Sequence, residues 1–145
     1  MSMLQEKEIK VRSKVFWRGG LKTSSVVRGF EVGTDKPKSD FGTNTAPAPM
    51  EVFISGMGAC LLSTFVWAVY RAHLEIEDCT VGVKATTTKT GKKGISGAAM
   101  KLTVWAGSEH RKKLDKCFDL AKNTCTLTKS VSFPLEFIME FKDSR

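Results

Sequence analysis

The sequence predicts a single α+β domain in which two long helices pack against an antiparallel β-sheet. Short stretches of alternating apolar and charged residues are typical of half-buried strands. A run of nineteen residues without a charge, 52–70, is too long for a strand and predicts a helix. A second helix is indicated by apolar residues at helical spacing after residue 110. The predicted order is β-β-α-β-β-α-β, and 145 residues suit one domain, 1–145.

The N-terminal part predicts a hairpin followed by a long loop. Apolar residues alternate with charged ones over Glu8–Phe16, which indicates a half-buried strand. Arg18, Gly19 and Gly20 form a turn signal, and a second strand is predicted over Leu21–Val32. The residues 33–49 are rich in Gly, Pro, Asn, Asp and Thr. Loops of this length are uncommon in a compact domain and are often functional.

The first helix is predicted over Pro49–Leu74, because proline suits the first turn of a helix. It is apolar on nearly every side, as in a helix that is buried on several sides. Its length also approaches that of a membrane span. Small and polar residues such as Ser55 and Thr64 favour a core helix instead, and no membrane partner is expected. A two-layer domain leaves one side of such a helix open, so we expect a homodimer.

The C-terminal half predicts three strands and one helix. Strands are expected over Cys79–Thr88 and Ala98–Ala106, separated by a Gly/Lys turn. Ser108 is expected to cap a helix over 109–123. The apolar stripe of this helix is Leu114, Cys117, Phe118 and Ala121. The last strand is predicted over Ser130–Phe141, and Pro134 within it indicates an edge or a bulge.

The charge balance indicates a solvated basic surface. The chain has 23 Lys and Arg against 15 Asp and Glu, a net charge of +8. The lysines are scattered, and no nucleic-acid-binding signature accompanies them, so no nucleic acid is expected as a partner. The first residues carry charges where a signal peptide has an apolar core, which favours the cytoplasm. Thiols there stay reduced. No motif for a cofactor or a metal occurs, and neither is expected.

Cys60 is the first candidate for chemistry, because small residues surround it on the first helix. Gly56 lies one turn before it, and Ser63 and Thr64 lie one turn after it. Glycine in a helix costs about 1 kcal/mol relative to alanine, so close packing or room for a ligand is indicated. A thiol reacts as thiolate, and Cys60 lies about 16 Å along the helix, beyond the effect of its dipole.

A cation from elsewhere in the chain is therefore needed beside Cys60. Arg18 and Arg28 flank the hairpin and the loop that precede the helix, and either could reach it. His73 is excluded as a partner within one chain, because thirteen helical residues separate it from Cys60 by about 20 Å. His110 falls in a charged turn and is expected to be exposed.

The other three cysteines differ in what their positions predict. Cys125 follows the second helix and extends its stripe if the turn continues, which makes it the second cysteine of interest. Cys117 is expected in the core, and Cys79 is expected to be structural.

Two segments carry a resemblance to a known family. The residues 46–53, which include Pro49, Met50 and Glu51, continue to Gly58-Ala59-Cys60-Leu61. They resemble the cysteine helix of the osmotically inducible protein and organic hydroperoxide resistance (OsmC/Ohr-like) family, in its general OsmC-like branch. The residues 27–44 resemble the loop before that helix, and the segment from Cys125 to Val131 resembles the second-cysteine segment. Thr126 follows Cys125 where proline is usual in the family.

The resemblance implies an intertwined homodimer and thiol peroxidase chemistry in oxidative stress defence. Cys60 is implied as the peroxidatic thiolate that becomes a sulfenic acid, and Cys125 as the residue that resolves it as a disulfide. Arg18 is implied to hold the thiolate, and Glu51 to orient that arginine. The implied partners are a small-molecule hydroperoxide and a dithiol reductant.

A second function remains open at the level of the sequence. The chain could be a non-catalytic module that binds an apolar small molecule in a pocket of the same dimeric fold. The residues expected to line that pocket are Phe53, Met57, Trp67 and Phe118.

Overall fold

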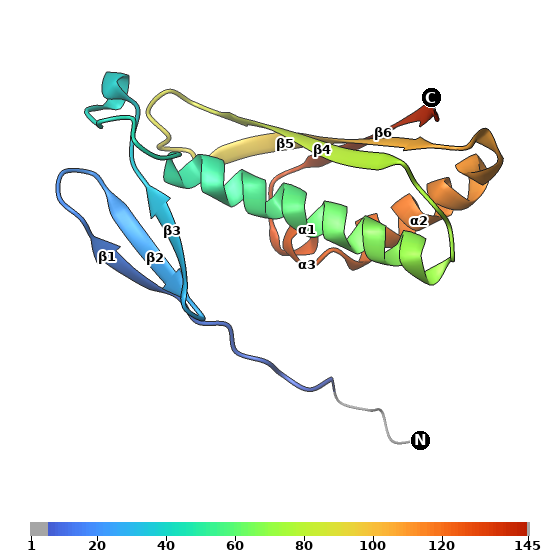
Figure 1. Cartoon of the computed structure of the whole chain (residues 1–145). Coiled ribbons are helices and arrows are strands. Elements are labelled where there is room, and N and C mark those ends of the chain that lie inside the picture. The colour runs from blue at the N-terminus through green and yellow to red at the C-terminus, as the bar shows by residue number, and fades with distance from the viewer. Residues whose placement is uncertain (1–5, 145) are drawn as a thin grey trace. The chain divides into compact units, whose positions relative to one another are not determined.

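The strands gather in two three-stranded sheets, one in each of two units of the chain (Figure 1). The computed structural model describes residues 6–144. The first unit is Met1–Val52 and the second is Phe53–Arg145. The α+β class is confirmed, with one strand and one helix more than the sequence predicts. The single domain over 1–145 stays a prediction.

The first sheet has the order β1-β2-β3 and is antiparallel throughout. Its strands are β1 (Lys14–Trp17), β2 (Thr23–Val27) and β3 (Phe30–Thr34). The predicted turn after β1 is confirmed, with positive φ at Gly19 and Gly20. The prediction of one strand over 21–32 is wrong, because Arg28 and Gly29 form a two-residue turn. Their φ values of 52° and 86° fit the primed turns that match the twist of a hairpin.

The predicted first strand is shorter than its alternating pattern. Regular pairing begins at Lys14, which lies opposite Val26 at the end of β2. No residue of β2 remains to pair with the segment 8–13, so that segment extends beyond the sheet. Its apolar side chains Ile9 and Val11 are 81% and 83% exposed. The pattern is that of a strand, but the described chain supplies no partner for it.

The long helix α1 (Pro49–Arg71) begins where the sequence predicts and ends three residues earlier. His73 adopts a left-handed conformation, with φ 56°, in the residue position where helices commonly terminate. Its N–H donates to the Tyr70 carbonyl, and the Leu74 N–H donates to the Val69 carbonyl. These two bonds satisfy carbonyls that the helix leaves open, so His73 terminates the helix.

Only one face of α1 is buried, rather than several sides. Met57, Leu61 and Phe65 are fully buried in the core. Trp67 and Tyr70 on another face are 55% and 77% exposed. By length and composition α1 would also qualify as a membrane span, with a mean hydropathy of 1.9. Its buried face belongs to the core, as expected for a core helix.

The second sheet has the order β4-β5-β6. Its strands are β4 (Asp78–Thr87), β5 (Ile95–Ala106) and β6 (Leu135–Asp143). The pairing of β4 with β5 is antiparallel, but β6 runs parallel to β5, which corrects the prediction of a wholly antiparallel sheet. Parallel neighbours need a crossover connection, and the residues between β5 and β6 provide one. The predicted edge position of the last strand is confirmed, and Pro134 lies just before it.

The crossover contains two helices and a short 3₁₀ turn. The turn η2 (Ser108–His110) leads into α2 (Arg111–Thr124), and α3 (Thr126–Ser130) follows. The sequence analysis missed α3. It also assigned the cap of α2 to Ser108, whereas His110 precedes the helix and no side chain caps it. A further 3₁₀ turn, η1 (Lys38–Asp40), lies in the long loop of the first unit.

The core of the second unit lies between one face of the second sheet and the helices on that side (Figure 1). Phe65 of α1 and Phe118 of α2 meet edge to face, with ring centroids 6.5 Å apart. From the sheet, β5 contributes the fully buried Met100, Leu102 and Val104. The predicted stripe of the second helix is confirmed as core. This packing fixes α1 and the α2–α3 segment relative to each other.

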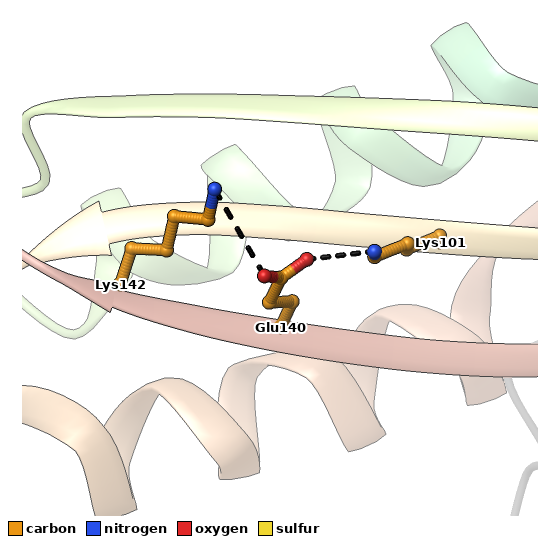
Figure 2. A network of polar contacts seen from close by, with 3 residues as sticks. All are labelled: Lys101, Glu140 and Lys142. Carbon is orange, nitrogen blue, oxygen red and sulfur yellow. Dashed lines mark ion pairs between the residues drawn. The ribbon is translucent and has the colours of Figure 1, made fainter.

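The other face of the second sheet is polar. Figure 2 shows Glu140 of β6 between two lysines, with Lys101 Nζ 2.7 Å and Lys142 Nζ 3.9 Å from its carboxylate. Hydrogen bonding and charge from Lys101 lower the pKa of Glu140. Exposed ion pairs contribute little to stability, so the network indicates a solvent-facing side of the sheet.

Two glycines of α1 should respond oppositely to alanine. A Cβ at Gly58 would lie 2.9 Å from Val83 Cγ2 on β4, whereas a Cβ at Gly56 would meet Leu127 Cδ1 at 3.9 Å, an ordinary contact. We expect G58A to lower the free energy of unfolding by about 1–3 kcal/mol through overpacking. We expect G56A to raise it by about 0.5–1 kcal/mol through helix propensity. Urea unfolding at equal protomer concentration measures both, and equal effects would contradict the packing.

Candidate functional site

Cys60 lies in the middle of α1 and is half-buried. Its carbonyl accepts hydrogen bonds from the Thr64 hydroxyl at 2.7 Å and from the Ser63 hydroxyl at 3.2 Å. These small polar residues therefore bond to the main chain of the helix. The nearby glycines serve packing, since Gly58 abuts β4 and Gly56 lies against α3. Cys60 remains accessible on a helix that the core holds in place.

Cys125 is fully buried at the junction of α2 and α3. The helical stripe does not continue through it, because its backbone is extended, with φ −66° and ψ 115°. Its N–H donates to the Ala121 carbonyl at 2.9 Å, and its own carbonyl accepts the Lys129 N–H at 3.2 Å. The residue is thus fixed by both helices that flank it.

The structure brings the two predicted cysteines together. The Cys125 thiol is hydrogen-bonded to Cys60, and both thiols are free. Burial raises the pKa of Cys125, and the hydrogen bond to Cys60 and the charge of Cys60 raise it further. A hydrogen bond that raises the pKa of a thiol is one that the thiol donates. Cys125 therefore keeps its proton and offers it to the sulfur of Cys60.

Thr128 is a neighbour of this pair that the sequence analysis missed. It is a buried polar residue of α3, three positions after Cys125. Hydrogen bonds from its hydroxyl and its N–H lower the pKa of Cys125 against the effects that raise it. A threonine three residues after a residue that precedes a helix is the available sequence signal, because side chains in that position meet the first free N–H groups.

The remaining cysteines are placed as the sequence predicts. Cys117 belongs to the core of α2, and burial raises the pKa of its thiol. Burial, followed by the charge of Asp78, raises the pKa of Cys79 to about 12. Neither thiol is prepared for reaction, because the thiolate is the reactive form. Among the described residues, no cluster of His, Cys, Asp and Glu suited to a metal ion occurs.

The predicted arginines lie in the first unit. Arg18 is exposed after β1, with its guanidinium carbon 5.1 Å from the centroid of the Phe16 ring. Arg28 occupies the β2–β3 turn, 5.3 Å from the Phe30 ring. Cys60 and Cys125 belong to the second unit. A contact of either arginine with Cys60 therefore stays a prediction.

Glu51 lies in the first turn of α1. Its Oε1 accepts the Ala48 N–H at 2.8 Å, and a carboxylate there also favours the positive end of the helix dipole. This contact gives Glu51 a structural role at the start of the helix. Its predicted role in orienting an arginine stays a prediction.

The long loop before α1 is organised by Asp35, a second residue that the sequence analysis did not single out. The side chain is almost fully buried at 1% exposure. Its carboxylate accepts the N–H groups of Lys36, Thr43 and Thr45 and the hydroxyls of both threonines. These bonds, led by the Thr43 hydroxyl, lower the pKa of Asp35. One carboxylate thereby holds the two ends of the loop together.

The residues predicted to line an apolar binding pocket do not share one surface. Met57 and Phe118 lie in the core, whereas Phe53 and Trp67 are 48% and 55% exposed. A cavity of about 240 Å³ lies instead between α1 and β4. It is lined by Ile54, Ser55, Gly58, Ala59, Leu62, Val81 and Val83.

Comparisons with known proteins agree on the type of chain. A family model described as OsmC-like protein matches residues 42–140. An OsmC-like protein from Mycoplasma pneumoniae superposes with a TM-score of 0.77 at 16% identity, covering 96% of this chain and 100% of that chain. No curated protein matches the sequence.

Two other solved structures with the same fold are described as organic hydroperoxide resistance proteins. The one from Legionella pneumophila has a TM-score of 0.69 at 16% identity, covering 94% of this chain and 99% of its own. The one from Elizabethkingia anophelis has a TM-score of 0.68 at 15% identity, covering 96% and 99%. At these identities the likeness establishes the fold.

The loop should depend on the charge of Asp35. In D35N, we expect faster hydrogen exchange at the amides of Lys36, Thr43 and Thr45 near neutral pH, because a neutral amide accepts these bonds less strongly. The folded state lowers the pKa of Asp35, so the stabilising effect is complete above its unfolded pKa of about 3.8 and is lost as the pH falls below it. Protection factors measured by NMR should therefore converge between wild type and D35N in acid.

The exposed Asp40 of the same loop provides the matched control. D40N should leave the protection of those amides unchanged. Equal loss in D35N and D40N would contradict the role of Asp35.

Proposed function

Because the chain belongs to the OsmC-like protein family, we propose that it is a thiol-dependent peroxidase that reduces organic hydroperoxides or hydrogen peroxide. The observation that carries the proposal is the contact between an accessible thiol, Cys60, and a buried thiol, Cys125. A peroxide can approach the first, and the second is in place to react with the product. The fold shared with hydroperoxide resistance proteins supports the substrate class.

In the first step, the Cys60 thiolate attacks one oxygen of the hydroperoxide. The O–O bond breaks, the sulfur becomes a sulfenic acid, and the alkoxide leaves as the alcohol after it takes up a proton. In the second step, the Cys125 sulfur attacks the Cys60 sulfenic sulfur. An S–S bond forms, and the hydroxyl leaves with the Cys125 proton as water. A dithiol reductant returns two electrons and two protons and restores both thiols.

A cation is needed to favour the Cys60 thiolate, since the start of α1 lies about 16 Å away along the helix. We propose Arg18 for this role and Glu51 as the residue that orients it. The hydrogen bond from the Ala48 N–H supports this proposal, because it fixes one oxygen of the Glu51 carboxylate. Cofactors and metals have no part in this cycle.

The proposed protein is an intertwined homodimer. The exposed apolar residues Val66, Trp67 and Tyr70 on α1 are of the kind that subunit interfaces cover. The alternating segment 8–13 extends past the first sheet and supplies a further strand for a partner. We place this homodimer in the cytoplasm, where dithiol reductants are available.

Intact mass spectrometry tests the reaction. After one equivalent of cumene hydroperoxide, wild type should lose two hydrogen atoms and two free thiols, because a disulfide forms. C125S should gain one oxygen atom, because the sulfenic acid at Cys60 has no thiol to react with. C60A should react at neither position.

The buried thiol Cys117 supplies the control, since C117A should behave as wild type. An unchanged mass of wild type after peroxide treatment would overturn the peroxidase proposal. Full peroxide turnover by C60A would overturn the role of Cys60.

The dimer is tested separately by light scattering at micromolar concentration. Wild type should have twice the mass of the chain. V66D/Y70D should be monomeric, because two buried carboxylates oppose association. A monomeric wild type would contradict the homodimer.

A further inference from the structure

We propose that Thr128 is a positioning residue for the second chemical step, in which its hydroxyl turns to the Cys125 sulfur and stabilises the negative charge that develops there. The inference rests on the proposed function, since it assigns a residue to the resolving half of that cycle. It concerns a hydroxyl that touches neither the peroxide nor Cys60.

The position of Thr128 allows this movement without cost to the main chain. In the resting structure its hydroxyl donates to the Cys125 carbonyl at 3.2 Å. The same carbonyl accepts the Lys129 N–H, also at 3.2 Å. A hydroxyl has one proton, so it can serve the carbonyl or the sulfur. When it turns to the sulfur, the carbonyl keeps a partner and no buried polar group is left unsatisfied.

Burial makes this hydroxyl more important than it would be at the surface. Cys125 is fully buried, and Thr128 is 6% exposed, so water does not supply the missing donor. An uncompensated charge in such a place is costly. The hydroxyl and the N–H of Thr128 both favour the ionised sulfur, whereas Cys60 is the titratable group that opposes it. Once Cys60 is a neutral sulfenic acid, that opposition ends and the donors of Thr128 remain.

The chemistry needs these donors at two moments. Cys125 must lose its proton to attack the sulfenic sulfur, and the proton leaves with the hydroxyl as water. When a dithiol later attacks the Cys60 sulfur of the disulfide, the S–S bond breaks and Cys125 departs as thiolate. Thiolates of lower pKa leave faster, so a donor at Cys125 assists both closure and reduction.

The test compares T128V, which replaces the hydroxyl with a methyl group of similar size, with T128S, which keeps the hydroxyl. Sulfenic acid formation should be unchanged in T128V. Closure of the disulfide, followed by stopped-flow mixing with cumene hydroperoxide and mass analysis, should be slower by about tenfold, and T128S should restore it. T124V is the matched control, because Thr124 carries an exposed hydroxyl that bonds only to the Leu120 carbonyl.

A second measurement is independent of peroxidase activity. In C60A, the pKa of Cys125 is read from the ¹³Cβ shift of labelled cysteine, and T128V should raise it while T124V should not. Unchanged closure and an unchanged pKa in folded T128V would overturn the inference. If T128V does not fold, equal pKa values in C60A and in C60A/T128A would do so. A wild type that forms no sulfenic acid would overturn the proposed function, while a raised pKa would still show the hydrogen bond at Cys125.

Discussion

The close approach of α1 to the second sheet is the constraint on which the rest of the second unit depends. Gly58 permits it, because Val83 occupies the space that a side chain would need. The approach buries Met57, Leu61 and Phe65 and leaves the opposite side of the helix exposed. It also fixes the rotation of α1, and with it the direction in which Cys60 points. A reactive residue on a core helix is thereby held more firmly than one on a loop.

Local patterns in the sequence predicted most elements, and the errors arose where the pattern lacked information about partners. The run 52–70 and the stripe of α2 identified both long helices. The strand predicted over 8–16 failed because alternation describes a strand without showing that β2 is too short to pair with it. The parallel pairing of β6 was missed because the direction of a strand depends on its connection, and α3 is too short for its periodicity to be recognised.

For the candidate site, the sequence identified the cysteines, whereas the tertiary structure identified their neighbours. Small residues around Cys60 drew attention to it, although the glycines serve packing. Contact with Cys125 depends on a break in the helical stripe at that residue, which no local pattern announced. Thr128 and Asp35 escaped notice for the same reason, since a polar residue gains its importance from burial. Arg18 and Glu51 rest on the family resemblance.

The location of Cys125 in the crossover between two parallel strands has a thermodynamic consequence. A covalent bond to Cys60 would join the long helix to the crossover and close a loop of about sixty-five residues in the unfolded chain. Loop closure of that size removes chain entropy equivalent to roughly 4 kcal/mol. Each turn of the proposed cycle would therefore alternate the protein between a looser and a tighter folded state. The supply of reductant would govern its resistance to unfolding as well as its activity.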